Sequence, residues 1–207
     1  LKNREFILDE KLKKYVHYYD IIIIDCPPSL SLSTVNSLVF SNEVLIPVQC
    51  EYFALEGLKH LSNTVELIQK NLNPKLKICG ILLTMYDART NLSRDVELEV
   101  RAHFNETFNV VIPRSIRLSE APSHGISVLD YDPESAGAVA YNQLAEEFLN
   151  LSNDAAEGLN KIVGFFILLI LISIAIFFSA FVKLLNNLKF ILFLNFSLKK
   201  FFFLLKI

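Results

Sequence analysis

The sequence predicts an α/β domain with a parallel β-sheet in residues 1–153, followed by a hydrophobic tail in residues 154–207. Short β-branched runs alternate with helical patterns, and the run Ile21–Ile24 is apolar on both faces. This alternation is typical of βαβ crossovers, and a strand without a polar face suits the middle of a parallel sheet. Charge separates the tail: residues up to Gly158 hold 14 Lys and Arg against 22 Asp and Glu, whereas the later residues hold six Lys, no acid and 11 of the 17 Phe.

The expected elements follow one another along residues 1–153. Residues 3–18 have nearly helical apolar spacing, and the strand formed by Ile21–Ile24 stops before Pro27, since proline has no N–H for the ladder. Tyr52 and Phe53 are expected in the core. The remaining elements are helices over 31–40, 52–71, 92–104 (capped by Asn91 or Ser93) and 135–149, and strands over 43–48 (closed by Pro47), 77–84 and 109–112 (closed by Pro113).

Ligands of parallel α/β sheets bind at the carboxyl ends of the strands, which directs attention to residues 25–29, 49–51, 84–91 and 113–120. Asp25 directly follows a buried apolar run and so has the form of a Walker B acid. A carboxylate at that edge can hold Mg²⁺ directly or through water. An ordinary strand end with a polar residue is the alternative reading of this pattern.

Several kinds of site are excluded by residue counts. The six glycines never come within four residues of one another, so the 207 residues contain no Gly-rich phosphate loop. The three cysteines fit neither a disulfide framework nor a zinc site, and the four histidines have no ligand spacing. Because the chain begins at Leu1 and its one Met is Met85, we expect it to be part of a longer protein.

Four sequence blocks stand out at and after the expected strand ends. They are Asp-Cys-Pro-Pro-Ser-Leu at 25–30, Ile-Pro-Val-Gln-Cys-Glu-Tyr-Phe-Ala-Leu-Glu-Gly-Leu at 46–58, Leu-Leu-Thr-Met-Tyr-Asp-Ala-Arg-Thr-Asn-Leu at 82–92, and Val-Ile-Pro-Arg-Ser-Ile-Arg-Leu-Ser-Glu-Ala-Pro-Ser-His-Gly at 111–125. These blocks resemble the ParA/Soj group of partition ATPases, in the order and spacing of that family. The related ATPase MinD would be expected to carry Pro-Ala-Gly after the Walker B acid, where this chain has Pro-Pro-Ser.

The resemblance implies roles for residues in these blocks. Asp25 is implied to support Mg²⁺ through water. Arg89 and Arg117 match basic positions that hold non-specific DNA, although solvated surface charge is an equally good reading of two arginines. The implied switch loop is Cys26, Pro27, Pro28 and Ser29, and the residues implied to flank the adenine are Thr84, Met85, Pro113 and Arg114.

The resemblance further implies an N-terminally truncated, P-loop NTPase-like domain that belongs to a chromosome or plasmid partitioning ATPase. Such proteins use ATP and Mg²⁺, form homodimers, bind DNA non-specifically and respond to a ParB-like partner in the cytoplasm at the nucleoid. The family's phosphate-binding lysines and water-positioning acid are absent from these 207 residues. No catalytic residue is therefore assigned, and the chain is expected to be inactive alone.

The tail departs from the family. The 21 residues from 162 to 182 contain no charged side chain. As a helix they would be about 32 Å long, which is enough to cross a bilayer. Three readings stay open: read-through or out-of-frame translation of AT-rich DNA, which yields Phe, Ile, Leu, Lys and Asn; a membrane anchor; and a surface-lying amphipathic helix of the MinD type. The alternative function is accordingly a non-catalytic, membrane-anchored remnant or a MinD-like membrane-associated ATPase.

Overall fold

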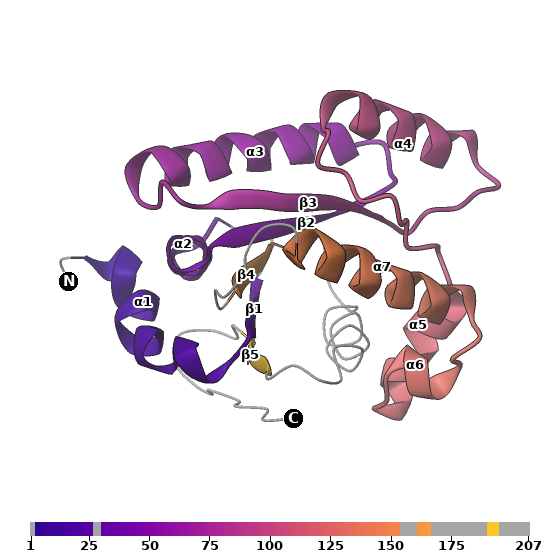
Figure 1. Cartoon of the computed structure of the whole chain (residues 1–207). Coiled ribbons are helices and arrows are strands. Elements are labelled where there is room, and N and C mark those ends of the chain that lie inside the picture. Colours follow the sequence, from indigo (N-terminus) through magenta and orange to yellow (C-terminus); the bar gives the residue numbers. More distant parts are fainter. Residues whose placement is uncertain (1–2, 27–29, 154–160, 167–189, 195–207) are drawn as a thin grey trace.

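The computed structural model describes residues 3–26, 30–153, 161–166 and 190–194 (Figure 1). Its helices are α1 (Ile7–Leu12), α2 (Leu32–Phe40), α3 (Ala54–Asn71), α4 (Asn91–His103), α5 (Ile116–Glu120), α6 (Val128–Tyr131) and α7 (Ala136–Asn153), with 3-10 turns at Arg4–Phe6, Lys13–Tyr18 and Ala121–His124. Its strands are β1 (Ile21–Cys26), β2 (Glu43–Gln49), β3 (Lys77–Thr84), β4 (Lys161–Phe166) and β5 (Phe190–Leu194).

The described strands form one sheet in the order β3-β2-β4-β1-β5, and all of their pairings are parallel. β1 lies inside this sheet, with β4 on one edge and β5 on the other. β2 pairs with β3 from Glu43 to Gln49. The predicted α/β class with a parallel sheet is therefore confirmed, and the run Ile21–Ile24 occupies the interior strand that its sequence predicts.

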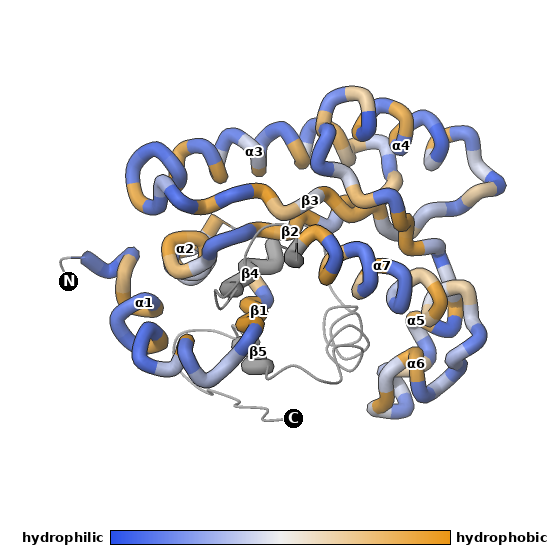
Figure 2. The backbone as a smooth tube through the Cα atoms, in the orientation of Figure 1, coloured by the Kyte–Doolittle hydropathy of each residue, from blue (hydrophilic) through white to orange (hydrophobic). Residues whose placement is uncertain are grey.

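Helices cover both faces of the sheet, as Figure 1 shows. Side chains of β1 alternate between the two faces, because successive residues of a strand point in opposite directions. Ile22 and Ile24 join a buried cluster with residues of α1, α2, α3 and α4. Ile21 and Ile23 join a second cluster, built with α7 and the short helices before it. Figure 2 shows the consequence: apolar residues concentrate in β1, β2 and β3, and polar residues on the outer turns of α3 and α4.

Several predicted boundaries shift in the structure. Asp25 lies inside β1 rather than after it. Pro47 lies within β2 and does not close it, because β4 pairs only with Glu43–Leu45 and leaves that edge of β2 without a ladder to interrupt. The cap of α4 is Thr90, whose Oγ1 accepts a hydrogen bond from the Ser93 backbone N–H at 3.3 Å. The predicted caps Asn91 and Ser93 are both residues of the helix.

The predicted strand 109–112 is not a regular strand. Residues 106–113 run beside β3 and form isolated bridges, Ile81 with Thr107 and Tyr86 with Pro113, together with a further hydrogen bond from the Ile112 N–H to the Leu83 carbonyl at 2.8 Å. The reason lies in α7: the Glu147 carboxylate accepts hydrogen bonds from the backbone N–H groups of Asn109 (2.8 Å) and Val110 (3.0 Å). Those two donors are satisfied by a side chain, so they do not extend a ladder.

The potential membrane helix over 162–182, one of the three open readings of the tail, is not formed by its first five residues. Residues 162–166 belong to β4, which pairs with β1 from Ile21 to Cys26. The sequence of β4, Lys-Ile-Val-Gly-Phe-Phe, is rich in the β-branched and aromatic residues that suit a strand. Residues 167–182 lie outside the described residues. No helix in the described part of the chain is both long and apolar enough to cross a membrane.

Candidate functional site

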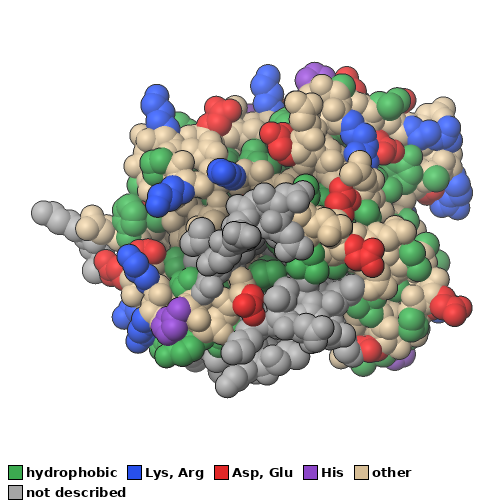
Figure 3. Space-filling view, viewed as in Figure 1, with side chains coloured by type: hydrophobic (Ala, Val, Ile, Leu, Met, Phe, Trp, Pro, Cys, Tyr) green, Lys and Arg blue, Asp and Glu red, His purple; other side chains and the backbone are tan. Residues whose placement is uncertain are grey.

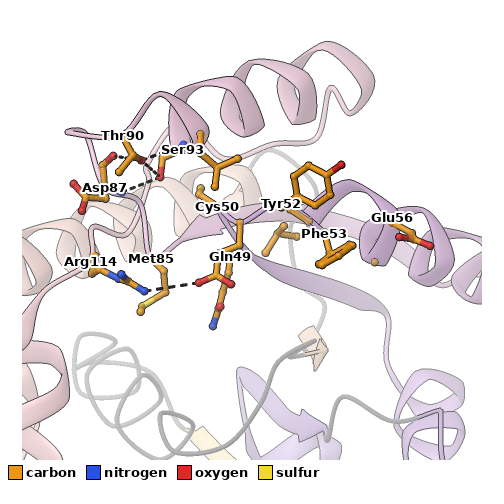
Figure 4. Close-up of a pocket in the computed structure, with 15 residues that line it drawn as sticks. Gln49, Cys50, Tyr52, Phe53, Glu56, Met85, Asp87, Thr90, Ser93 and Arg114 are labelled. Carbon is orange, nitrogen blue, oxygen red and sulfur yellow. Dashed lines mark hydrogen bonds and ion pairs between the residues drawn. The ribbon is translucent and has the colours of Figure 1, made fainter.

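A cavity of ≈ 780 Å³ opens at the carboxyl ends of β2 and β3 (Figure 4). Its walls come from the segment after β2, the first residues of α3, the loop after β3, the start of α4 and Arg114. This position matches the expectation for a parallel α/β sheet, and the volume suits a small organic ligand. The lining residues are Val48, Gln49, Cys50, Glu51, Tyr52, Phe53, Ala54, Glu56, Gly57, Met85, Asp87, Thr90, Leu92, Ser93 and Arg114.

The end of β3 forms the floor of this region. Thr84 is buried, and its Oγ1 donates a hydrogen bond of 3.2 Å to the Val48 carbonyl of β2. The Thr84 carbonyl in turn accepts from the Cys50 N–H at 3.0 Å. Met85 then has a φ of +54°, a left-handed conformation that a non-glycine residue adopts at a cost. The chain turns sharply there, and the Met85 side chain lines the cavity.

The segment at Pro113 lies directly beside this turn. The Tyr86 N–H donates to the Ile112 carbonyl at 3.1 Å, and the Arg114 N–H donates to the Tyr86 carbonyl at 2.8 Å. Met85 and Arg114 thereby reach one cavity from segments that are far apart in the sequence. Thr84 lies beneath that cavity, and Pro113 is half-buried at the bridge and does not line it.

An ion pair crosses the rim of the cavity. Arg114 Nη2 lies 3.7 Å from Glu51 Oε1, and Figure 4 shows this contact beside Met85 and Gln49. Both side chains are more than half exposed, so the pair is worth little to stability. It does place a guanidinium group next to the apolar wall, and such a group can lie against a planar ligand as well as a carboxylate.

Arg89 is held by a carboxylate that our sequence analysis missed. Asp87 accepts from Arg89 Nε at 2.9 Å, from Nη2 at 2.7 Å and from the Arg89 backbone N–H at 3.0 Å. These bonds hold the pKa of Asp87 well below its usual range, so the acid stays ionised. The Arg89 side chain is nevertheless 87 % exposed and can be reached from solvent. The sequence Asp-x-Arg at 87–89 was the available signal for this pair.

Arg117 is also paired. Its Nη1 donates to Glu120 at 2.9 Å, its Nε lies 3.2 Å from Asp132, and its guanidinium lies 5.9 Å from the centre of the Tyr131 ring. The side chain is 52 % exposed. The structure thus places Arg89 and Arg117 at the surface but in two separate groups, one next to α4 and one next to α5. Figure 3 shows cationic side chains gathered at the right-hand end of the molecule, over the region beside α4.

Asp25 lies apart from the cavity. It is 7 % exposed, and its Oδ1 has no hydrogen-bond partner within the described residues. Burial raises the pKa of Asp25 to about 7, because the charged carboxylate is poorly solvated there. β4 separates β1 from β2, so Asp25 and the cavity lie on different strands along the same edge of the sheet. Of the predicted switch loop, Cys26 is buried at the end of β1, whereas Pro27, Pro28 and Ser29 lie outside the described residues.

An orphaned carboxylate oxygen of this kind fits a bound cation. Within the described residues, no group of three or more His, Cys, Asp or Glu side chains could hold a metal ion by itself. Mg²⁺ often binds proteins through one or two carboxylates and keeps several waters, so the single carboxylate of Asp25 is compatible with Mg²⁺ held through water.

Two residues of the cavity contradict their expected burial. Tyr52 and Phe53 are 78 % and 71 % exposed, although the sequence analysis expected both in the core. They precede α3, which begins at Ala54, so they are not part of the apolar face that the later turns of this helix bury. Their rings contact each other edge to face, with centroids 5.1 Å apart.

Comparison with known proteins finds similar chains among named partition proteins. The chain is 56 % identical over 146 residues to the sporulation initiation inhibitor protein Soj of Bacillus subtilis, covering 70 % of this chain and 58 % of Soj. It is 50 % identical over 148 residues to the chromosome partitioning protein ParA of Myxococcus xanthus, covering 71 % of this chain and 52 % of that protein. The chain is related to the ParA/Soj partitioning ATPases. A family profile described as an AAA domain matches residues 1–78.

Solved structures agree on the fold. Cobyrinic acid a,c-diamide synthase from Mycobacterium smegmatis, solved with bound ADP and magnesium, superimposes with a TM-score of 0.62 at 33 % identity, covering 78 % of this chain and 58 % of the synthase. A plasmid partition protein from Borrelia burgdorferi shares the fold at a TM-score of 0.50 and 20 % identity, covering 75 % of this chain and 56 % of that protein. The ParA/Soj-related chain spans somewhat more than half the length of the relatives that it matches.

Proposed function

We propose that this chain carries part of the nucleotide site of a partitioning ATPase that binds ATP and Mg²⁺, dimerises, binds DNA non-specifically and responds to a ParB-like partner. The convergence of Met85 and Arg114 on one cavity at the carboxyl ends of β2 and β3 is the observation that carries this proposal. The identity of 50 to 56 % to proteins named Soj and ParA supports it, as does the ADP and magnesium bound by the cobyrinic acid a,c-diamide synthase.

In this proposal the residues divide the nucleotide between two places. The cavity holds the adenine base against Met85 and the Arg114 guanidinium, while Thr84 and Pro113 lie in the two segments that carry these residues. Asp25 holds water molecules of Mg²⁺, and its carboxylate stays ionised once a cation neutralises it. Bound Mg²⁺ would offset negative charge on the phosphates during the conversion of ATP and water to ADP and phosphate.

The 207 residues do not include a Gly-rich phosphate loop, so we expect them to bind a base weakly and not to hydrolyse ATP by themselves. A test must therefore detect weak binding. Saturation-transfer NMR with adenosine is suitable, because it reports contacts at millimolar affinity. We expect transfer from the protein to the adenine protons, and strong loss of that transfer in Arg114→Glu.

The control for that experiment is Lys70→Glu, which makes the same charge change on the exposed face of α3. Wild-type transfer should persist in this variant. Absence of transfer to adenosine in the wild type, or equal transfer in Arg114→Glu, would show that the cavity is not the base site. Hydrolysis of ATP by the 207-residue chain above a buffer blank would contradict the expected inactivity.

DNA binding is the second part of the proposal. Phosphates would compete with Asp87 for Arg89 and with Glu120 and Asp132 for Arg117, so binding should be weak and salt-dependent. Fluorescence anisotropy with a labelled duplex should show lower affinity and a shallower salt dependence for Arg89→Glu with Arg117→Glu. Unchanged binding would remove both arginines from the DNA-binding surface.

A further inference from the structure

Gln49 presents a side-chain amide to the cavity without a partner of its own. It is the last residue of β2, is half-buried and lines the cavity. Its side chain makes no hydrogen bond to any other described residue. A primary amide offers two N–H donors and a carbonyl acceptor side by side, so Gln49 can bond a ligand that carries one donor next to one acceptor.

Several other polar groups around the cavity already have partners, whereas the Tyr52 hydroxyl is exposed to solvent. The Asp87 carboxylate accepts hydrogen bonds from Arg89. It could accept a hydrogen bond from a ligand only by giving up one of these bonds. Arg114 pairs with Glu51 across the rim. The Thr90 and Ser93 hydroxyls bond each other at 3.0 Å. Among the described residues that line the cavity, Gln49 is therefore the one that offers a donor and an acceptor side by side without a partner.

The wall near Gln49 suits a flat ring. Tyr52 and Phe53 expose most of their surfaces at the same cavity, and Met85 supplies a flexible apolar side chain. Figure 4 shows Tyr52 and Phe53 on one side of the site and Met85 and Arg114 on the other. Covering large apolar side chains with a planar group is favourable, because it removes apolar surface from water, and nucleobases stack on aromatic rings in this way.

Adenine matches the amide of Gln49, and guanine does not. Along its N7 edge adenine carries the N6 amino donor beside the N7 acceptor, whereas guanine carries two acceptors, O6 and N7. Gln can therefore form two hydrogen bonds with adenine and one with guanine. We propose that Gln49 selects adenine over guanine in this cavity through paired hydrogen bonds to the base edge, while Phe53 and Tyr52 stack on the base. This inference rests on the proposed nucleotide function.

Three nucleosides separate the two contributions. Adenosine carries the 6-amino group, purine riboside has the same ring without it, and guanosine carries an oxygen at that position. We expect the 207-residue chain to bind adenosine about tenfold more tightly than either of the others, as measured by saturation-transfer titrations. Gln49→Leu should bind adenosine and purine riboside equally. Phe53→Ala should weaken all three by a similar factor, because stacking does not depend on the amino group.

Two further variants keep the test decisive. Gln49→Met retains the length of the side chain and should give the same loss of selectivity if Gln49→Leu does not fold. Gln143→Leu makes the matched change at an exposed position of α7 and should keep the wild-type ratio. Adenosine selectivity that survives both Gln49 variants, or a wild type that does not distinguish adenosine from purine riboside, overturns the inference.

Failure of the proposed function would give a different experimental result from failure of the Gln49 inference alone. Were the base site elsewhere, Arg114→Glu would leave adenosine binding unchanged, and both the proposed function and the role of Gln49 would fall. Binding that depends on Arg114 but not on Gln49 overturns the inference alone. A change in oligomeric state of Phe53→Ala with unchanged nucleoside binding would assign the aromatic pair to a protein interface and overturn its stacking role.

Discussion

The carboxyl ends of β2 and β3 and the carboxyl end of β1 lie along one edge of the same sheet, but their polar groups are satisfied very differently. At β2 and β3, Thr84 bonds the Val48 carbonyl and Asp87 binds Arg89 and Ser93. At β1, the Asp25 carboxylate is buried, and its Oδ1 has no partner within the described residues. Apart from the Gln49 amide that faces the cavity, these groups of the first region are paired within the protein, whereas the second region carries the electrostatic cost of a buried carboxylate.

This difference shows where each part of a nucleotide would have its effect. A base entering the β2–β3 cavity would add contacts to a formed wall. A cation at Asp25 would relieve a buried charge that the described protein does not neutralise, and so would stabilise the fold as well as the ligand. Four substitutions test this difference between the two strand ends.

The largest effect should come from Asp25→Asn at high pH. The pKa of Asp25 is raised from its ordinary 3.8 to about 7, so the folded state holds a proton that the unfolded state loses. The contribution of Asp25 to stability is therefore greatest below pH 4 and falls as the pH rises toward 7, by about 4 kcal/mol in all. The amide cannot ionise and removes this loss. Urea denaturation at pH 5 and pH 8 measures the part of the loss that falls between these two pH values, about 2.5 kcal/mol.

The matched control for that experiment is Asp95→Asn on the exposed face of α4, which should leave the pH dependence of stability unchanged. If Asp25→Asn were no more stable than wild type at pH 8, the Asp25 charge would be compensated in solution, and the contrast between the two strand ends would disappear.

A smaller effect is expected on the β2–β3 side from Thr84→Val. The substitution keeps the shape of the side chain but removes the hydroxyl that donates to the Val48 carbonyl. The carbonyl is left without that donor, so we expect a loss of about 1 to 2 kcal/mol that does not vary between pH 5 and pH 8. A pH-dependent loss would mean that this region shares the electrostatic problem of Asp25.

Thr90→Ala should cost about 1 kcal/mol, since Thr90 caps α4 through the Ser93 N–H. The same substitution should increase hydrogen exchange of the first amides of α4 while the amides of β1 keep their protection. Hydrogen exchange read by mass spectrometry resolves the two segments. Equal loosening of both would show that the two strand ends are not independent.

Glu51→Gln is expected to change stability least, by less than about 0.5 kcal/mol, because its partner Arg114 and Glu51 itself are both exposed. Thermal unfolding of this variant should coincide with that of the wild type. A shift of several degrees would instead make the rim ion pair part of the structure of the cavity.

Much of the fold was predictable because its signals are local. Four consecutive isoleucines predict an interior strand from local sequence alone. The helical spacing before Pro74 likewise predicts α3 and the place where it ends. The absence of a regular strand at 109–112 was not predictable in this way, because Glu147 accepts the hydrogen bond of the Asn109 amide from 38 residues away. β4 was missed for a related reason: an uncharged run has no period, and its pairing with β1 and β2 is long-range.

The candidate site shows the same division. The carboxyl ends of β2 and β3 were predicted from strand order, and the resemblance supplied Met85 and Arg114. The exposure of Tyr52 and Phe53 was not predicted, because aromatic residues beside a helix are core residues more often than cavity residues. The pairing of Arg117 with Asp132 depends on a turn between α5 and α6, which composition does not reveal.

The titration of the Asp25 carboxyl carbon, followed by ¹³C NMR in the 207-residue chain, tests the contrast most directly. A buried carboxylate without a protein partner should titrate with a pKa of about 7 in the absence of metal. A pKa near the ordinary 3.8 would contradict the account, because it would mean that the protein already stabilises the charge that we assign to a bound cation.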